Sequence, residues 1–130
     1  MMKYLKQILM LSVSIVVLNV WLLRINKATI YRGGNATNMY EEFIVYGLDE
    51  PFLYFIGILK VLAALGLLVG LIYKKLVIPC AFVIAVLMFG AVVMHFKVSD
   101  EIYKCIPAGL MLVCSLSIVF ISKSEAKLLS

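Results

Sequence analysis

The stretch Phe52–Tyr73, FLYFIGILKVLAALGLLVGLIY, is the longest apolar run in the chain and carries one charge, Lys60. An α-helix needs about 20 predominantly apolar residues to cross the hydrocarbon of a bilayer. A lysine at the centre of a span is unfavourable by about 2.5–3.5 kcal/mol, whereas each Leu, Ile, Phe or Val is favourable by about 0.3–0.6 kcal/mol. The stretch holds 14 residues of those four types, and their total of about 4–8 kcal/mol exceeds the penalty of Lys60. We therefore predict a transmembrane helix.

Three further apolar stretches accompany this one, and together they predict spans at residues 7–24, 52–73, 76–96 and 105–122. Of the 130 residues, 65% are hydrophobic and 15% are charged, against about 45–50% and about 25% in soluble domains. A soluble protein of this size has too much surface for its volume to bury so many apolar side chains. This excludes a soluble enzyme, a disordered chain and a disulfide-stabilised secreted domain. We predict an all-α, integral membrane four-helix bundle, a single domain over residues 1–130 with one longer loop between the first two spans.

The net charge of +5 comes from lysines and arginines scattered between the apolar runs, as is typical of residues that flank membrane spans. The sequence has no basic helix and no stripe of alternating basic and aromatic residues, so we expect no nucleic-acid partner. Four spans place both termini on one side of the membrane. The basic N-terminus and the Lys74-Lys75 turn favour the cytoplasm for that side. One histidine and three separated cysteines predict no metal site.

The loop between the first two spans is predicted to hold one short helix. Asn38-x-x-Glu41 is a helix-capping pattern, and Gly47 and Pro51 follow as terminators of a helix that ends at about Tyr46. Its apolar and aromatic side chains suit a position at the membrane interface or across the end of the bundle.

Lys60 is the leading candidate for a functional residue, because an ionisable group inside a span usually faces the bundle interior or a wet cavity. Its neighbours one turn away, Gly57 and Ala64, are small, so another helix can approach the lysine closely. The alternative is a structural role, in which Lys60 extends toward the interface or pairs with carbonyl groups of a neighbouring helix. Gly66 and Gly70 form a second pair of small residues on a different face of the same helix.

Other polar residues are predicted at the same outer end of the bundle as Lys60. His95 ends the third span, where an imidazole can transfer protons, bind a head group or hydrogen-bond a quinone-like carbonyl. Arg24 and Tyr54 complete this candidate polar site, although Arg24 and Trp21 can equally be interface anchors. Such a basic pocket would hold an anionic or carbonyl-bearing ligand, or dock the acidic loop helix. The acidic partners available in the outer loops are Glu41, Glu42, Asp49, Glu50, Asp100 and Glu101.

Two segments resemble the DoxX-like family of small membrane proteins. The first is Tyr46-Gly47-Leu48-Asp49-Glu50-Pro51 with Phe55–Leu68; the second is Gly90-Ala91-Val92-Val93-Met94-His95, followed by Lys97, Asp100 and Ile106-Pro107-Ala108. The resemblance covers roughly residues 46–120, and it implies a four-helix protein of a bacterial inner membrane. Gly90 and Ala91 are predicted helix-packing residues. Lys60 stands where many relatives carry Glu and one subgroup carries Lys, so Lys60 and His95 are the positions that match a polar site inside the membrane.

The founding member of the family is a small subunit of a thiosulfate:quinone oxidoreductase, which implies an accessory component of a membrane redox or quinone-linked system. The ligand would then be a quinone or a lipid, with no cofactor in the chain itself. The partners would be the bilayer and either a membrane redox enzyme or a second copy of the chain. Animal relatives act as chaperones of receptor assembly, which implies a membrane-protein assembly factor as the alternative. A small permease or channel subunit is disfavoured, because four helices with one central charge line a pathway poorly.

Overall fold

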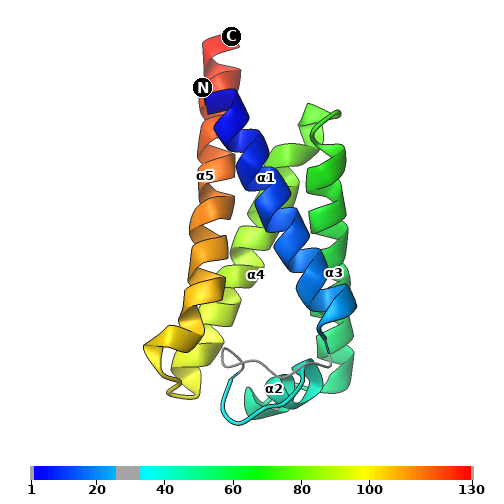
Figure 1. Ribbon diagram of the computed structural model, residues 1–130, viewed down its shortest axis with the longest axis vertical. Coiled ribbons are helices and arrows are strands. Elements are labelled where there is room, and N and C mark those ends of the chain that lie inside the picture. The colour runs from blue at the N-terminus through cyan, green and yellow to red at the C-terminus, as the bar shows by residue number, and fades with distance from the viewer. Residues whose placement is uncertain (1, 26–32, 130) are drawn as a thin grey trace.

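The computed structural model describes residues 2–25 and 33–129, and every regular element in these two ranges is a helix. All four spans are present as helices long and apolar enough to cross a membrane, which confirms the predicted fold. They are α1 (Met2–Leu18), α3 (Glu50–Val69), α4 (Val77–Lys97) and α5 (Ile106–Leu129), with a short α2 (Met39–Val45) between the first two (Figure 1). A π-helical turn, Asn19–Leu23, continues α1, and 3₁₀ turns at Lys74–Leu76 and Ile102–Cys105 precede α4 and α5.

The ends of α3 differ from the predicted span ends for local reasons. The helix begins at Glu50 rather than Phe52, because the side chain of Asp49 caps it by accepting a hydrogen bond from the backbone N–H of Phe52 at 3.3 Å. It stops at Val69 because Gly70, a poor helix former, opens the turn into α4.

At one end of the bundle α1 lies beside α3 and α4 lies beside α5, and these two helix pairs separate there (Figure 1). At the other, narrow end α1 lies beside α5 and α3 lies beside α4 (Figure 1). α1 begins and α5 ends at the narrow end, as an even number of spans requires. α5 extends beyond its predicted end at Ser122, and Glu125 in this extension forms an ion pair with Lys6 of α1 at 2.6 Å. We call the opposite end, where α1 lies beside α3 and away from α5, the wide end.

Every long helix contributes to one buried core and also exposes large apolar side chains. The most deeply buried apolar side chains include Met10, Val13, Val17, Leu67, Ile84 and Ile118. On the outside, Ile58, Phe89 and Phe120 are 59%, 60% and 69% exposed. Because lipid tails are as apolar as these side chains, a bilayer is the environment in which this surface is stable.

Small residues on two faces of α3 set which helices it touches. A Cβ atom on Gly57 would lie 2.6 Å from Cζ3 of Trp21, so the indole that follows α1 packs directly on this glycine. A Cβ atom on Gly66 would clash with Sγ of Cys80, so the absence of a side chain at Gly66 lets α4 pack closely against this face of α3. The prediction that Gly66 and Gly70 mark a packing face distinct from that of Gly57 and Lys60 is confirmed, since Gly70 lies against Val77.

α2 lies across the wide end of the bundle and forms a roof over it (Figure 1). The predicted cap is present, because the side chain of Asn38 accepts a hydrogen bond from the backbone N–H of Glu41 at 2.8 Å. The helix stops before Gly47, whose φ of +82° favours glycine. Met39 and Phe43 are buried under α2, and the backbone N–H of Met39 donates to the carbonyl of Ile25 at 2.8 Å.

Candidate functional site

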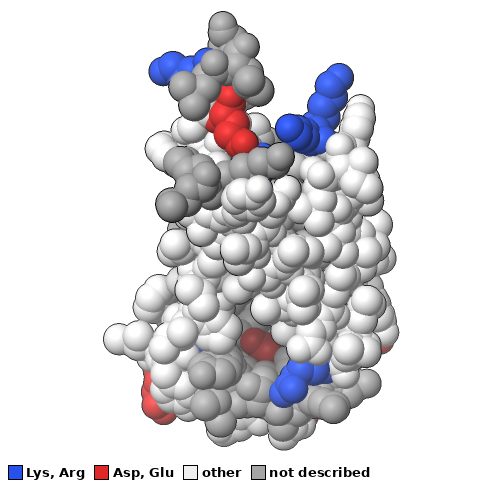
Figure 2. All heavy atoms as spheres, turned by 45° about the horizontal axis from the view of Figure 1, so that its top comes forward, with Lys and Arg blue, Asp and Glu red and all other residues white. Residues whose placement is uncertain are grey.

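A cavity of about 530 Å³ lies between the diverging helix pairs, beneath α2. Most of its wall is apolar, with contributions from all four long helices. Figure 2 shows a hollow on the face turned toward the viewer, near the wide end, with acidic side-chain atoms inside it. The charged and titratable residues that line the cavity are Arg24, Glu42, Tyr46, Lys60, His95 and Lys104.

Lys60 projects from α3 into this cavity, and the residue as a whole is only 9% exposed. Its ammonium nitrogen lies 5.4 Å from the centre of the Trp21 ring, which is within the range of a cation–π interaction. The carboxylate of Glu42 attracts it electrostatically. In the part of the chain that the structure describes, no hydrogen-bond acceptor is placed against this nitrogen. The site therefore offers a hydrogen-bond donor to whatever enters the cavity.

Trp21 is part of the site rather than a membrane-interface anchor, so the interface interpretation of this residue is wrong. The side chain is buried, with 7% exposure, and packs on Gly57. Its ring also meets that of Phe43 edge to face, with centroids 6.1 Å apart. These contacts fix the indole plane next to Lys60, and they link the roof to both α1 and α3.

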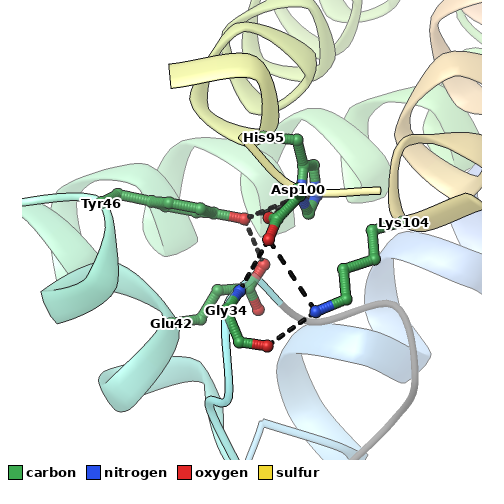
Figure 3. A network of polar contacts seen from close by, with 6 residues as sticks. All are labelled: Gly34, Glu42, Tyr46, His95, Asp100 and Lys104. Atoms are coloured by element: carbon green, nitrogen blue, oxygen red, sulfur yellow. Dashed lines mark hydrogen bonds and ion pairs between the residues drawn. The ribbon is translucent and has the colours of Figure 1, made fainter. Parts of the chain in front are cut away.

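A polar network lies at the wide end of the cavity (Figure 3). Nδ1 of His95 lies 2.8 Å from Oδ2 of Asp100, and both side chains are 5% exposed. The hydroxyl of Tyr46 lies 3.4 Å from Nε2 of the same histidine and donates to Oε1 of Glu42 at 2.6 Å. The network thus runs from the loop after α4, through His95, to the acidic residue of α2 that faces Lys60.

The phenol of Tyr46 is held in its protonated form. Burial, and after it the neighbouring Glu42 carboxylate, raises the pKa of Tyr46 well above its usual range. Tyr46 is therefore a lasting hydrogen-bond donor to Glu42. Lys97 adds a contact from outside the cavity, because its ammonium group donates to the backbone carbonyl of Tyr46 at 3.0 Å.

Asp100 is held in its ionised form. Burial by itself raises the pKa of this carboxyl group, but several favourable contacts outweigh burial and leave the pKa below its usual value. These contacts are the hydrogen bond from the backbone N–H of Gly34 at 2.9 Å, the bond from His95, and the attraction of His95 and Lys104. With Asp100 ionised, Nδ1 of His95 carries the shared hydrogen and Nε2 faces Tyr46.

The structure brings together three of the four predicted polar residues. Lys60, His95 and Arg24 line one cavity, whereas Tyr54 does not. Tyr54 is 57% exposed and donates to Glu50 at 3.2 Å on the outside of α3. Its place follows from helix geometry: six residues at about 100° each leave Tyr54 about 120° around the helix from Lys60.

Two of the predicted helix-packing residues, Gly90 and Ala91, line the cavity. A Cβ atom on Gly90 would meet nothing within 4 Å, so the prediction that Gly90 packs against another helix is wrong. The small size of both residues instead leaves room in the cavity. Ala64 is fully buried, as expected for a helix contact.

Sequence reasoning missed Trp21 and Tyr46 as parts of the site. Both are ordinary in their own segments, and only the packing of α2 and α1 on α3 and α4 brings them to Lys60 and His95. Of the six acidic residues available as partners, the structure selects Glu42 and Asp100. Among the described residues there is no cluster of three or more His, Cys, Asp and Glu side chains that could hold a metal ion.

Comparison with known proteins gives one result. The family model of the DoxX-like family matches residues 15–117, and the chain therefore belongs to the DoxX-like family. A search of the curated proteins and a search of the solved structures found no match.

Proposed function

We propose that this DoxX-like protein binds a membrane-soluble amphiphile with a carbonyl-bearing head, a quinone above all, and serves as an accessory component of a membrane redox system. The observation that carries the proposal is the ammonium group of Lys60 inside a largely apolar cavity at membrane depth. A buried cation of this kind is expensive and usually functional. A carbonyl oxygen is the acceptor that this donor lacks among the described residues.

The shape and lining of the cavity suit such a molecule. Its volume of about 530 Å³ falls within the range of small-molecule and cofactor sites, about 300–1,000 Å³. The walls beside Lys60 are apolar, with Val17, Ile56, Met88 and Met111 among them, so they would pack against a ring and the first part of an apolar tail.

At Lys60 itself, the neighbouring Glu42 carboxylate favours a neutral head over an anion. Glu42 attracts Lys60, and it lines the same cavity. An anionic head near Lys60 would be repelled by this carboxylate, whereas a carbonyl oxygen accepts a hydrogen bond from the ammonium group without adding charge. Tyr46 keeps Glu42 in place through its hydrogen bond.

In this role the chain binds and orients the quinone, and a partner membrane enzyme or a second copy of the chain lies beside it. Lys60 would hold one carbonyl oxygen, while the polar network with His95 closes the other end of the site from water. Exclusion of water strengthens the hydrogen bond to the head group. Electron transfer would belong to the partner.

The experiment is a quinone titration of the purified protein in lipid nanodiscs. Trp21 is the single tryptophan of the chain and lies beside Lys60, so its fluorescence reports on the cavity directly. We expect saturable quenching by a short-chain quinone, a much weaker response in Lys60→Met, and an unchanged response in Lys75→Met, which removes an exposed lysine at the α3–α4 turn.

Mass spectrometry of the protein purified in mild detergent provides a second test. Quinone that co-purifies with the wild type and is lost in Lys60→Met supports the proposal. Absence of saturable quenching contradicts it. Stoichiometric recovery of another membrane protein, without quinone, would instead support the assembly-factor alternative.

A further inference from the structure

The cavity is bordered on one side by a seam between α1 and α5. These two helices are tied together at the narrow end by Lys6 and Glu125, and they separate toward the wide end (Figure 1). Val16 and Val20, from α1 and the turn that continues it, and Ala108 of α5 line the cavity where the helices separate. Figure 2 shows the hollow on this face.

The seam lies at membrane depth. α1 with its π-helical turn, and α5, are both long and apolar enough to span a bilayer, and the seam residues lie within these spans. Val16 is 39% exposed while it also lines the cavity, so the apolar outer surface continues into the cavity wall. A lipid tail in contact with this surface would meet no polar barrier in the wall that the seam residues form.

The roof, in contrast, is held by hydrogen bonds on the side that faces water. Lys104 donates to the carbonyl of Gly34 at 2.6 Å, and the N–H of the same glycine donates to Asp100. The bond of Lys97 to the carbonyl of Tyr46 fastens the end of α2 to α4. Entry through the roof would break several charge-assisted hydrogen bonds, whereas entry through the seam breaks none of them.

We propose that the cavity is filled from the bilayer, through the seam between α1 and α5, and that its natural occupant carries an acyl or isoprenoid chain that remains in this seam. The ligand class is thus an amphiphile already dissolved in the membrane, not a molecule taken from water. This inference rests on the proposed function for the nature of the head group. The route itself follows from the seam and the fastened roof, and it is tested without a quinone.

The test measures quenching of Trp21 in nanodiscs by two probes. The first is phosphatidylcholine brominated on its acyl chains, and the second is iodide in the surrounding buffer. We expect efficient quenching by the brominated chains and little by iodide, even though the tryptophan is only 7% exposed. Strong quenching by iodide with weak quenching by the brominated lipid would overturn the proposal.

Two variants at adjacent positions of α5 identify the seam. Ala108→Phe narrows the seam, and Gly109→Phe is its matched control, because a Cβ atom on Gly109 meets nothing within 4 Å and the residue does not line the cavity. We expect Ala108→Phe to lose most of the quenching by brominated lipid and Gly109→Phe to keep it. Val20→Phe, on the opposite side of the seam, repeats the test if Ala108→Phe does not fold.

The two proposals fail in different ways. Equal quenching in Ala108→Phe, Val20→Phe and the control would refute the seam while leaving the quinone titration unaffected. If the wild type shows lipid quenching that depends on the seam but no saturable response to quinone, the route stands and the quinone is the wrong ligand.

Discussion

Replacement of Lys60 by methionine separates a functional lysine from a structural one, because the two roles predict changes of opposite sign in stability. Met has a similar length and no charge. A lysine at the centre of a span is unfavourable by about 2.5–3.5 kcal/mol. The cation–π contact with Trp21 at 5.4 Å offsets about 0.5–2 kcal/mol of this. The attraction of Glu42 offsets a further part, although Glu42 keeps its hydrogen bond from Tyr46 in the variant.

The ligand-free variant should therefore be as stable as the wild type or more stable, by up to about 2 kcal/mol. Ligand binding should change in the other direction. A hydrogen bond from a charged donor contributes about 1.5–3 kcal/mol, so the Kd for quinone should rise by about 10- to 150-fold. Gained stability together with lost affinity is the expected result for a residue retained for function.

The assay is reversible unfolding in mixed micelles of mild detergent and dodecyl sulfate, followed by circular dichroism, in parallel with the quinone titration. Lys75→Met serves as the control, since it removes an exposed lysine outside the cavity. A Lys60→Met protein that unfolds more easily than the wild type and binds quinone equally well would refute the reasoning. It would show that Lys60 stabilises the bundle through Trp21 and Glu42.

Three further predictions concern other residues of the site and of the polar network at its wide end. Gly57→Leu places side-chain atoms where Trp21 packs, since even a Cβ atom would lie 2.6 Å from the indole. We therefore expect the free energy of unfolding to fall by about 1–3 kcal/mol and the fluorescence emission of Trp21 to shift. Unchanged emission would contradict the packing of Trp21 on Gly57. Asp100→Asn should speed hydrogen exchange at the amide of Gly34. In the wild type the same amide should be protected from exchange above about pH 4, the ordinary pKa of Asp. The protection should be lost as the pH falls through the lowered pKa of Asp100, because a group with a depressed pKa stabilises the fold only while its carboxylate is ionised. Tyr46→Phe should leave the phenolate absorbance titration unchanged up to about pH 11, because the raised pKa of Tyr46 keeps it protonated there; loss of titrating absorbance below that pH would contradict the burial of its hydroxyl.

The fold could be predicted from the sequence because its causes are local. Each span is recognisable from its own apolar length, and the short α2 from the cap at Asn38 and the terminator at Gly47. Depth in the membrane also follows from residue number, which is why Lys60 and His95 could be placed at one end of the bundle. Depth alone does not place Tyr54, because its rotation around the helix axis makes this residue face away from the cavity.

The site could be predicted only in part, because its remaining residues depend on packing between helices. Nothing in the segment around Trp21 distinguishes a core indole from an interface anchor until Gly57 is known to face it. Similarly, Asp100 was one of six acidic residues, and its pairing with His95 depends on how the chain turns after α4. The cavity itself has no sequence signal, since it depends on how the four long helices and α2 are placed relative to one another.

The same contacts that hold the bundle together also explain why the cavity exists. At the narrow end, Gly66 and Gly70 let α3 and α4 approach closely. At the wide end, the indole of Trp21 packs on Gly57 and contacts Phe43 of the roof. The end of α1 therefore lies against α3 and away from α5 (Figure 1). The space between the pairs is then left as the cavity that Lys60 lines. A Gly57 variant that displaces Trp21 should therefore alter access to the cavity as well as stability, whereas a variant at Gly66 should alter stability alone.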